Sequence, residues 1–206
     1  MGKRLAHRPV DQKKQEAILS SAFHEFCEQG IAGSSIEGIA ARAGVSKVTI
    51  YNHFGTKENL FAECVSAECQ RMRGSLHTVP LCETNLRIKL VAFGCSALEF
   101  LTRPEIIRFE RRIAAEMEHH PQIGLMFLDS GPRRMQKSLS DVFRQAVDDG
   151  QLTQCDPHMA AGHFFGMLKG FIDLEWRFCD AESAAQSWSI EKVEYAVDRF
   201  LKAYAA

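Results

Sequence analysis

Residues 34–60 of this chain read SSIEGIAARAGVSKVTIYNHFGTKENL. The pattern predicts a short amphipathic helix over 36–43, a turn at Gly44-Val45-Ser46, a second short helix over 46–54 and a further helix that begins at about Lys57. This succession is typical of a helix-turn-helix, whose second helix keeps a polar face because it enters a DNA groove. The stretch therefore predicts that the protein binds DNA.

The second helix of this motif carries unusual side chains for a surface helix. Ile50 and Phe54 lie four residues apart, so both can face inward and anchor the helix. The rest of its surface offers hydroxyl, amide, imidazole and ammonium groups, which suit phosphates and base edges. These residues are Lys47, Val48, Thr49, Tyr51, Asn52 and His53. Ser46 would leave backbone N–H groups and the positive end of the helix dipole free for a phosphate, and Lys57 could act from the other side.

The same residues resemble a known family. Ile39-Ala40, Ala43-Gly44-Val45-Ser46, Tyr51 with Phe54, and Lys57-Glu58 with Leu60 match the pattern of TetR-type bacterial regulators over roughly residues 12–60. One position departs from it, because Val48 stands where the family commonly has glycine or another small residue. Val48 could pack against a thymine methyl group, or it could hold the helix farther from the groove.

The resemblance implies a role for each residue of the motif. Ser35 and Ser46 would contact phosphate, and residues 47–49 would read bases. Tyr51, Asn52, His53 and Lys57 would add contacts to bases or backbone. The alternative is that Tyr51 and His53 only pack against the first helix and solvent. Arg4 and Arg8 could form a DNA-binding arm or a solvated start of the chain.

Composition sets the class of the protein. The chain has 206 residues, 46% of them hydrophobic, and a formal net charge of −1, with positive charge concentrated in residues 1–14. It shows no membrane span, signal peptide, nucleophile elbow or phosphate-binding glycine loop. Its seven cysteines are odd in number and form no CxxC pair, which favours reduced thiols in a cytoplasmic protein. We therefore expect no catalytic residue, cofactor or metal.

Helical periodicity runs through the chain, and strand signals are nearly absent. We predict an all-α fold of about nine helices: an N-terminal three-helix helix-turn-helix DNA-binding domain and a C-terminal helical domain for ligand binding and dimerisation. The predicted divisions are residues 1–57 for DNA binding with a basic arm, 58–80 for a linking helix and loop, and 81–206 for regulation.

The C-terminal half is expected to supply dimerisation and control. A helix-turn-helix usually pairs on two half-sites, and the two long helices predicted over 157–179 and 189–205 could form a four-helix homodimer interface, as the resemblance also implies. Apolar and aromatic side chains could line a pocket for a small hydrophobic ligand, or they could form an ordinary core. The candidates are Phe93, Phe100, Phe109, Met117, Phe127, Phe143, His163, Phe164, Met167 and Phe171. Residues 104–175 more loosely resemble the TetR-type repressors of efflux pumps.

The prediction is a transcriptional repressor that a small hydrophobic ligand releases from double-stranded, palindromic operator DNA, with no membrane partner. Two alternatives stay open. The protein could be an activator, because both kinds of regulator use the same chemistry to read DNA. It could also sense a metal through Cys155, His158 and His163, or thiol oxidation through Cys64 or Cys69.

Overall fold

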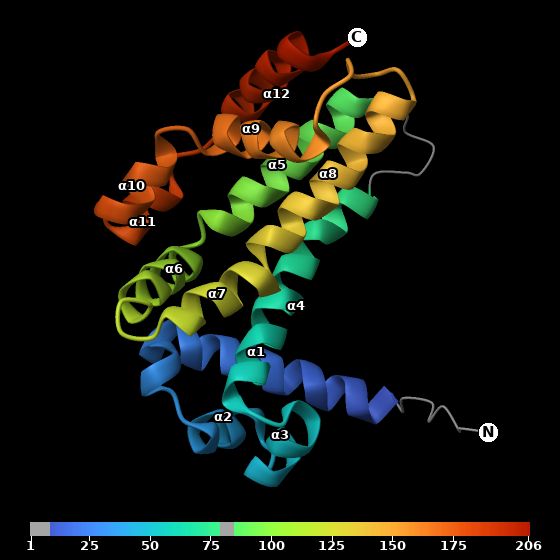
Figure 1. Cartoon of the computed structure of the whole chain (residues 1–206). Helices are drawn as coiled ribbons and strands as arrows, with labels where there is room; N and C mark the ends of the chain where they lie inside the picture. Colours follow the sequence, from blue (N-terminus) through green and yellow to red (C-terminus); the bar gives the residue numbers. More distant parts are fainter. Residues whose placement is uncertain (1–8, 79–84) are drawn as a thin grey trace, which may run out of the picture.

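A computed structural model describes residues 9–78 and 85–206, and over these residues the chain forms twelve helices (Figure 1). The all-helical fold class is therefore confirmed. No helix in the described ranges is long and apolar enough to cross a bilayer. In chain order the helices are α1 (Pro9–Gly33), α2 (Ile36–Ala43), α3 (Lys47–Phe54), α4 (Lys57–Thr78), α5 (Leu86–Leu101), α6 (Pro104–Glu116), α7 (Pro121–Ser130), α8 (Pro132–Asp148), α9 (Pro157–Lys169), α10 (Ile172–Phe178), α11 (Ala181–Ala185) and α12 (Ile190–Tyr204).

The structure has more helices than the nine expected, because the helical stretches near the C-terminus are interrupted more often than the periodicity suggests. The single helix predicted over 157–179 ends at Lys169, since Gly170 takes a positive φ of 47° that a continuing helix cannot contain. A new helix, α10, then starts at Ile172. The short α11 was not expected; the side chain of Asp180 caps it by accepting a hydrogen bond from the N–H of Ser183 at 2.8 Å.

The helices α1–α3 gather at one end of the molecule, and α4 leads from them into the rest of the chain (Figure 1). The first core lies at this end. Ile39 of α2 and Ile50 of α3 pack against Phe26 of α1 and Phe61 of α4, and all four are at most 1% exposed. Phe26 and Phe61 meet edge to face, with ring centroids 5.5 Å apart.

This first core is not confined to the helix-turn-helix. Phe109 and Ile113 of α6 and Ile123 of α7 are buried in the same cluster. Phe109 contacts the rings of both Phe23 and Phe61, at centroid distances of 5.6 and 5.9 Å. The end that carries the helix-turn-helix is therefore packed directly onto α6 and α7.

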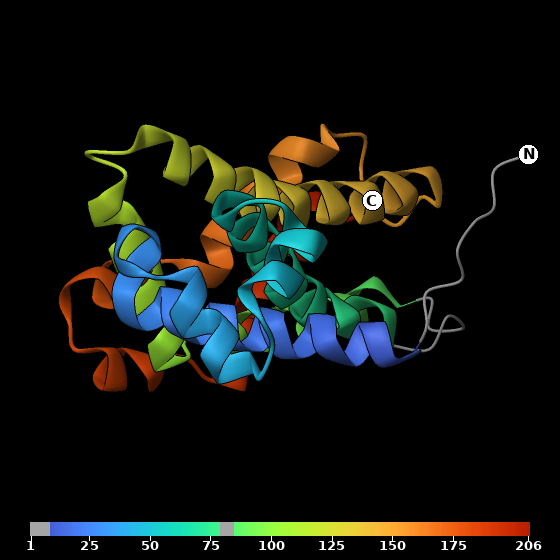
Figure 2. The same ribbon diagram turned by 90° about the horizontal axis from the view of Figure 1, so that it is seen from below.

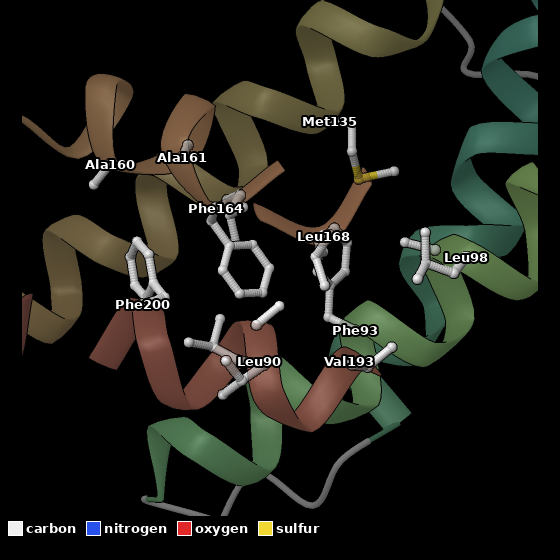
Figure 3. Packing of buried hydrophobic residues seen from close by; sticks show 14 of the residues in the cluster. Leu90, Phe93, Leu98, Met135, Ala160, Ala161, Phe164, Leu168, Val193 and Phe200 are labelled. Carbon is white, nitrogen blue, oxygen red and sulfur yellow. The ribbon is translucent and has the colours of Figure 1, made fainter. Parts of the chain in front are cut away.

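The second core fills the C-terminal half. Side chains from α5, α8, α9 and α12 point toward one another there (Figure 3). Phe200 stacks on Phe143 at 4.9 Å and meets Phe164 edge to face at 5.2 Å, and all three are fully buried. Removing a ring of this kind usually costs about 3–5 kcal/mol. This core therefore fixes α9 and α12 beside each other.

Candidate nucleic-acid interface and ligand cavity

Helix α3 lies at the end of the molecule that Figure 2 views from below. Ile50 and Phe54 are buried, as predicted, and hold the helix against the first core. On the opposite side Val48 is 60% exposed and Tyr51 is 48% exposed. The exposed row continues with Lys47 and Asn52, while Thr49 and His53 are half-buried. The structure thus brings most of the predicted DNA-reading side chains onto one open surface.

Two serine caps flank the turn of the motif. The hydroxyl oxygen of Ser35 accepts a hydrogen bond from the N–H of Gly38 at 3.0 Å at the start of α2. Ser46 does the same for the N–H of Thr49 at 3.1 Å at the start of α3. The turn itself closes at Gly44, whose φ of 66° suits glycine. Each cap satisfies one terminal N–H and leaves others in the first turn available to a phosphate.

Lys47 carries the positive charge nearest the start of α3. Its ammonium lies 3.2 Å from a carboxylate oxygen of Glu37 on α2, and both side chains are exposed. Backbone hydrogen bonding at Glu37, and then Lys47, hold the pKa of that carboxyl below its usual range. Because an exposed pair of this kind is weak, Lys47 can exchange Glu37 for a DNA phosphate at little cost.

Lys57 is the first residue of α4, and its side chain has hydrogen-bond partners within the protein. Its ammonium donates hydrogen bonds to the backbone carbonyls of Ile31 at 2.8 Å and Ser34 at 3.1 Å. These carbonyls lie where α1 gives way to α2. Lys57 therefore ties α4 to the turn before the motif, and its side chain is part-buried in doing so. Arg4 and Arg8 of the predicted arm lie outside the described residues.

A cavity of about 460 Å³ lies in the regulatory half next to the first core. Its walls come from helices throughout the chain, because Phe23 belongs to α1, Val65 to α4, Phe109 to α6 and Phe165 to α9. The remaining lining residues are Glu68, Cys69, Phe100, Leu101, Ile106, Glu110, Phe127, Leu128, Pro132, Arg133, Met135, Gln136, Gly162 and Lys169. A mostly apolar hollow of this volume with a few polar groups suits a small organic ligand.

Family models match both parts of the chain. Residues 18–64 match the bacterial regulatory proteins of the tetR family, and residues 89–206, more than half of the chain, match the C-terminal domain of AefR-like transcriptional repressors. The chain belongs to the TetR family. It is therefore a DNA-binding transcriptional regulator and not an enzyme.

Individual relatives of this TetR regulator agree with the family models. The HTH-type transcriptional regulator YhgD of Bacillus subtilis strain 168, itself uncharacterized, is 27% identical over 80% of this chain and 83% of its own. A crystal structure assigned to the TetR family from Mesorhizobium loti MAFF303099 superposes with a TM-score of 0.76 at 29% identity, covering 95% of this chain and 98% of that one. The flavonoid-responsive regulator FrrA superposes with a TM-score of 0.71 at 29% identity, covering 94% and 98%.

Only some of the residues predicted to line a ligand pocket do so. Three of them, Phe100, Phe109 and Phe127, line the cavity of the TetR regulator. In contrast, Phe93, Phe143 and Phe164 do not line it: they are fully buried in the second core, where the ring of Phe164 contacts those of Phe93 and Phe143.

The other predicted pocket residues lie at the surface. Met117 is exposed near the end of α6, and Met167 and Phe171 border a separate, shallower hollow beside α12. His163 is exposed on α9, and its Nδ1 lies 2.5 Å from the hydroxyl of Tyr204. Arg108, another polar side chain of this half, forms a 2.8 Å ion pair with Glu182.

Sequence reasoning missed the polar side chains that the cavity does contain, which are Glu68, Glu110, Arg133, Gln136 and Lys169. In the sequence each looks like an ordinary surface residue of an amphipathic helix. Glu110, for example, stands in the run RFERR. Periodicity alone could have flagged it, because it follows Phe109 on a helix whose inward face is otherwise apolar.

The structure bears on one of the two thiols considered for oxidation sensing, Cys64, and on the metal alternative. Burial, and next the Glu105 carboxylate, raise the pKa of the Cys27 thiol to about 12. Burial likewise raises the pKa of Cys64, and a thiol that stays protonated is a poor target for oxidation. Among the residues that the structure describes, no three His, Cys, Asp or Glu side chains come together as a metal site.

Proposed function

We propose that this TetR regulator is a repressor that binds a palindromic operator as a homodimer and leaves it when a small apolar ligand fills the cavity. The observation that carries the proposal is that helices lining the cavity also hold α3 in place. Phe23 of α1 and Val65 of α4 line the cavity, and the same two helices bury the anchors of α3. A ligand that favours a different spacing of these helices changes the position of α3. The name of FrrA, a flavonoid-responsive regulator, is consistent with control by an organic molecule.

The proposed DNA contacts are the exposed groups around the two caps. Ser35 and Ser46 bind phosphate through the helix starts, while Lys47, Val48 and Thr49 lie over the bases. Tyr51, Asn52 and His53 add base or backbone contacts. Lys57 holds the turn and comes near a phosphate through the same end of α4. The chain divides into a DNA-binding part over 1–57, a linking part over 58–80 and a regulatory part over 81–206.

The homodimer forms through α9, α10 and α12, within the regions 157–179 and 189–205. Met159 and Met167 on α9 are 55% and 41% exposed, and Gly166, where a Cβ would meet nothing within 4 Å, lies between them in the sequence. Such a face lets a second helix approach closely, and Phe171 extends it with 73% of its surface exposed. Exposed apolar side chains at this density favour contact with a second copy over contact with water.

DNA binding is tested by selecting bound sites from random duplex DNA with the full chain and then titrating variants by fluorescence anisotropy. Tyr51→Ala should weaken binding by about tenfold or more, as expected for the loss of one or two good contacts. Lys47→Ala should make the plot of log affinity against log salt concentration less steep by about 1, as expected for the loss of one phosphate contact. Lys137→Ala, which removes an exposed lysine from α8, serves as the matched control.

Wild-type affinity and salt dependence in both variants would contradict the assignment of α3 to the DNA. Selection of one half-site without a symmetric second half would contradict the palindromic operator. An increase in transcription from the selected site on addition of the protein would identify an activator.

A further inference from the structure

The charged side chains on the cavity wall differ in whether they have a partner. Arg133 is held by Asp129 at 2.7 Å, and Lys169 is held by Asp173 at 2.5 Å. Glu68 is bonded by Arg71 and faces the guanidinium of Arg103 at 4.0 Å, so its charge is compensated as well. These pairs leave one charged group of the lining to be accounted for.

That group is Glu110 on α6. It is half-buried, it lines the cavity, and no hydrogen bond or ion pair joins its carboxyl to another residue in the described parts of the chain. Lys169 and Arg177 favour the charged form of Glu110 from a distance, but their direct ion pairs are with the shared carboxylate of Asp173, at 2.5 and 2.7 Å. Burial raises the pKa of Glu110 above its usual range, which shows how poorly this environment stabilises the free carboxylate.

The apolar part of the cavity complements this carboxyl. Phe109 precedes Glu110 and meets Phe127 edge to face at 6.1 Å, and Phe23 lies 5.6 Å from Phe109 on the other side. All three rings line the cavity together with Phe100. Aromatic rings that line the same cavity as a half-buried carboxylate can form a site for a protonated amine with an apolar body, because ring faces attract cations and the carboxylate supplies the counter-charge.

We propose that the ligand of this cavity is a small amphipathic organic cation, an aromatic or alkyl body with one protonated amine, and that the amine pairs with Glu110. This inference rests on the proposed function, since it names the chemistry of the ligand that would release the operator. A neutral ligand would leave Glu110 without a direct ionic partner unless Glu110 took up a proton. An anionic ligand would meet two carboxylates, those of Glu110 and Glu68, whereas both cations of the lining are already paired.

The test uses three probes that share a naphthalene ring: the cation of 1-naphthylmethylamine, the neutral 1-naphthalenemethanol and the anion of 1-naphthylacetic acid. Each is titrated into the full chain by calorimetry, and each is then added to the complex with the selected operator DNA. The variants are Glu110→Gln, which keeps the shape and removes the charge, and the matched control Glu99→Gln, which makes the same change on the exposed side of α5. The thermal unfolding of each variant shows that it is folded.

We expect the amine to bind the wild-type chain about tenfold or more tightly than the alcohol, and the naphthylacetate to bind weakest, as a charge-assisted pair in an apolar site requires. Glu110→Gln should remove the preference for the amine, and Glu99→Gln should keep it. Equal affinities for amine and alcohol, no binding of the amine, or a preference that survives Glu110→Gln would overturn the inference.

The measurements on the complex with operator DNA separate this inference from the proposed function. If the amine binds through Glu110 but leaves the operator complex intact, the cavity chemistry stands and ligand-induced release fails. If the alcohol releases the operator as well as the amine does, release stands and the cation preference fails.

Discussion

Glu116 at the end of α6 bridges the regulatory half and the helix-turn-helix. Its Oε2 accepts hydrogen bonds from the backbone N–H groups of Ile31 at 3.1 Å and Ala32 at 3.2 Å. These N–H groups follow the break in α1 at Gly30, where φ is 71°. A Cβ at Gly30 would lie 1.7 Å from Oε1 of Glu116, so glycine is required there both by its conformation and by the approach of this carboxylate.

Replacing Glu116 by alanine removes both hydrogen bonds and leaves the N–H of the buried Ile31 without its partner. Hydrogen bonds to a charged group contribute about 1.5–3 kcal/mol each when buried. Because Ala32 is exposed, water can replace one of the two, and we expect a total loss of about 1.5–3 kcal/mol in the free energy of unfolding. Glu116→Gln keeps an acceptor of the same shape and should lose about half as much.

Urea denaturation monitored by circular dichroism measures this loss, with Glu118→Ala as the control for an exposed carboxylate just beyond the same helix. The second readout is the factor by which a bound ligand lowers operator affinity. Because Glu116 joins the cavity helix to the turn before α2, Glu116→Ala should reduce that factor, whereas a purely stabilising contact would leave it unchanged. A stability within about 0.5 kcal/mol of the control, the usual range for surface substitutions, would refute the reasoning.

Three further predictions concern single residues. Glu110→Gln should stabilise the fold at neutral pH, because the raised pKa of Glu110 means that the folded state disfavours the carboxylate. The gain in the free energy of unfolding should shrink as the pH falls toward the ordinary pKa of glutamate, about 4.3, and a gain independent of pH would contradict the raised pKa. Gly166→Glu, where a Cβ meets nothing within 4 Å, should leave the monomer folded but shift sedimentation to monomer, whereas Ala115→Glu on α6 should stay dimeric. Lys57→Met should lower the free energy of unfolding by about 1–3 kcal/mol along with operator affinity, since two backbone carbonyls lose their donor; loss of affinity alone would mean that Lys57 acts only on DNA.

The helix-turn-helix could be predicted closely from the sequence because its signals are local. Ser35, Gly44 and Ser46 mark helix boundaries through their own side chains or backbone freedom, and α2 has the bounds expected for it. The inward positions of Ile50 and Phe54 follow from spacing alone. Lys57 could not be placed in this way, because its partners, the carbonyls of Ile31 and Ser34, are set by the angle between α1 and α4.

The cavity could be predicted only in kind. Phe109 and Phe143 look the same in a helical pattern, yet Phe109 faces the cavity and Phe143 is packed between Phe164 and Phe200. Which apolar face meets a void depends on how several helices cross, and no local signal carries that information. Glu110 is different, because periodicity along α6 could have flagged it as an inward residue, but the sequence does not show that a cavity lies there. The break at Gly170 was also hidden, since a glycine within a helical pattern is often tolerated.

The shared core explains why a change in the cavity should reach the DNA surface. Phe109 of α6 lines the cavity and is buried in the cluster that holds Ile50 of α3. Close-packed side chains of this kind transmit displacement instead of absorbing it, because they have few voids into which to move. A ligand that shifts α6 must therefore also shift α1 and α4, or break contacts with them. Since Ile50 and Phe54 fix α3 to those helices, α3 moves with them as a unit, and in a dimer that movement changes the distance between the two copies of α3.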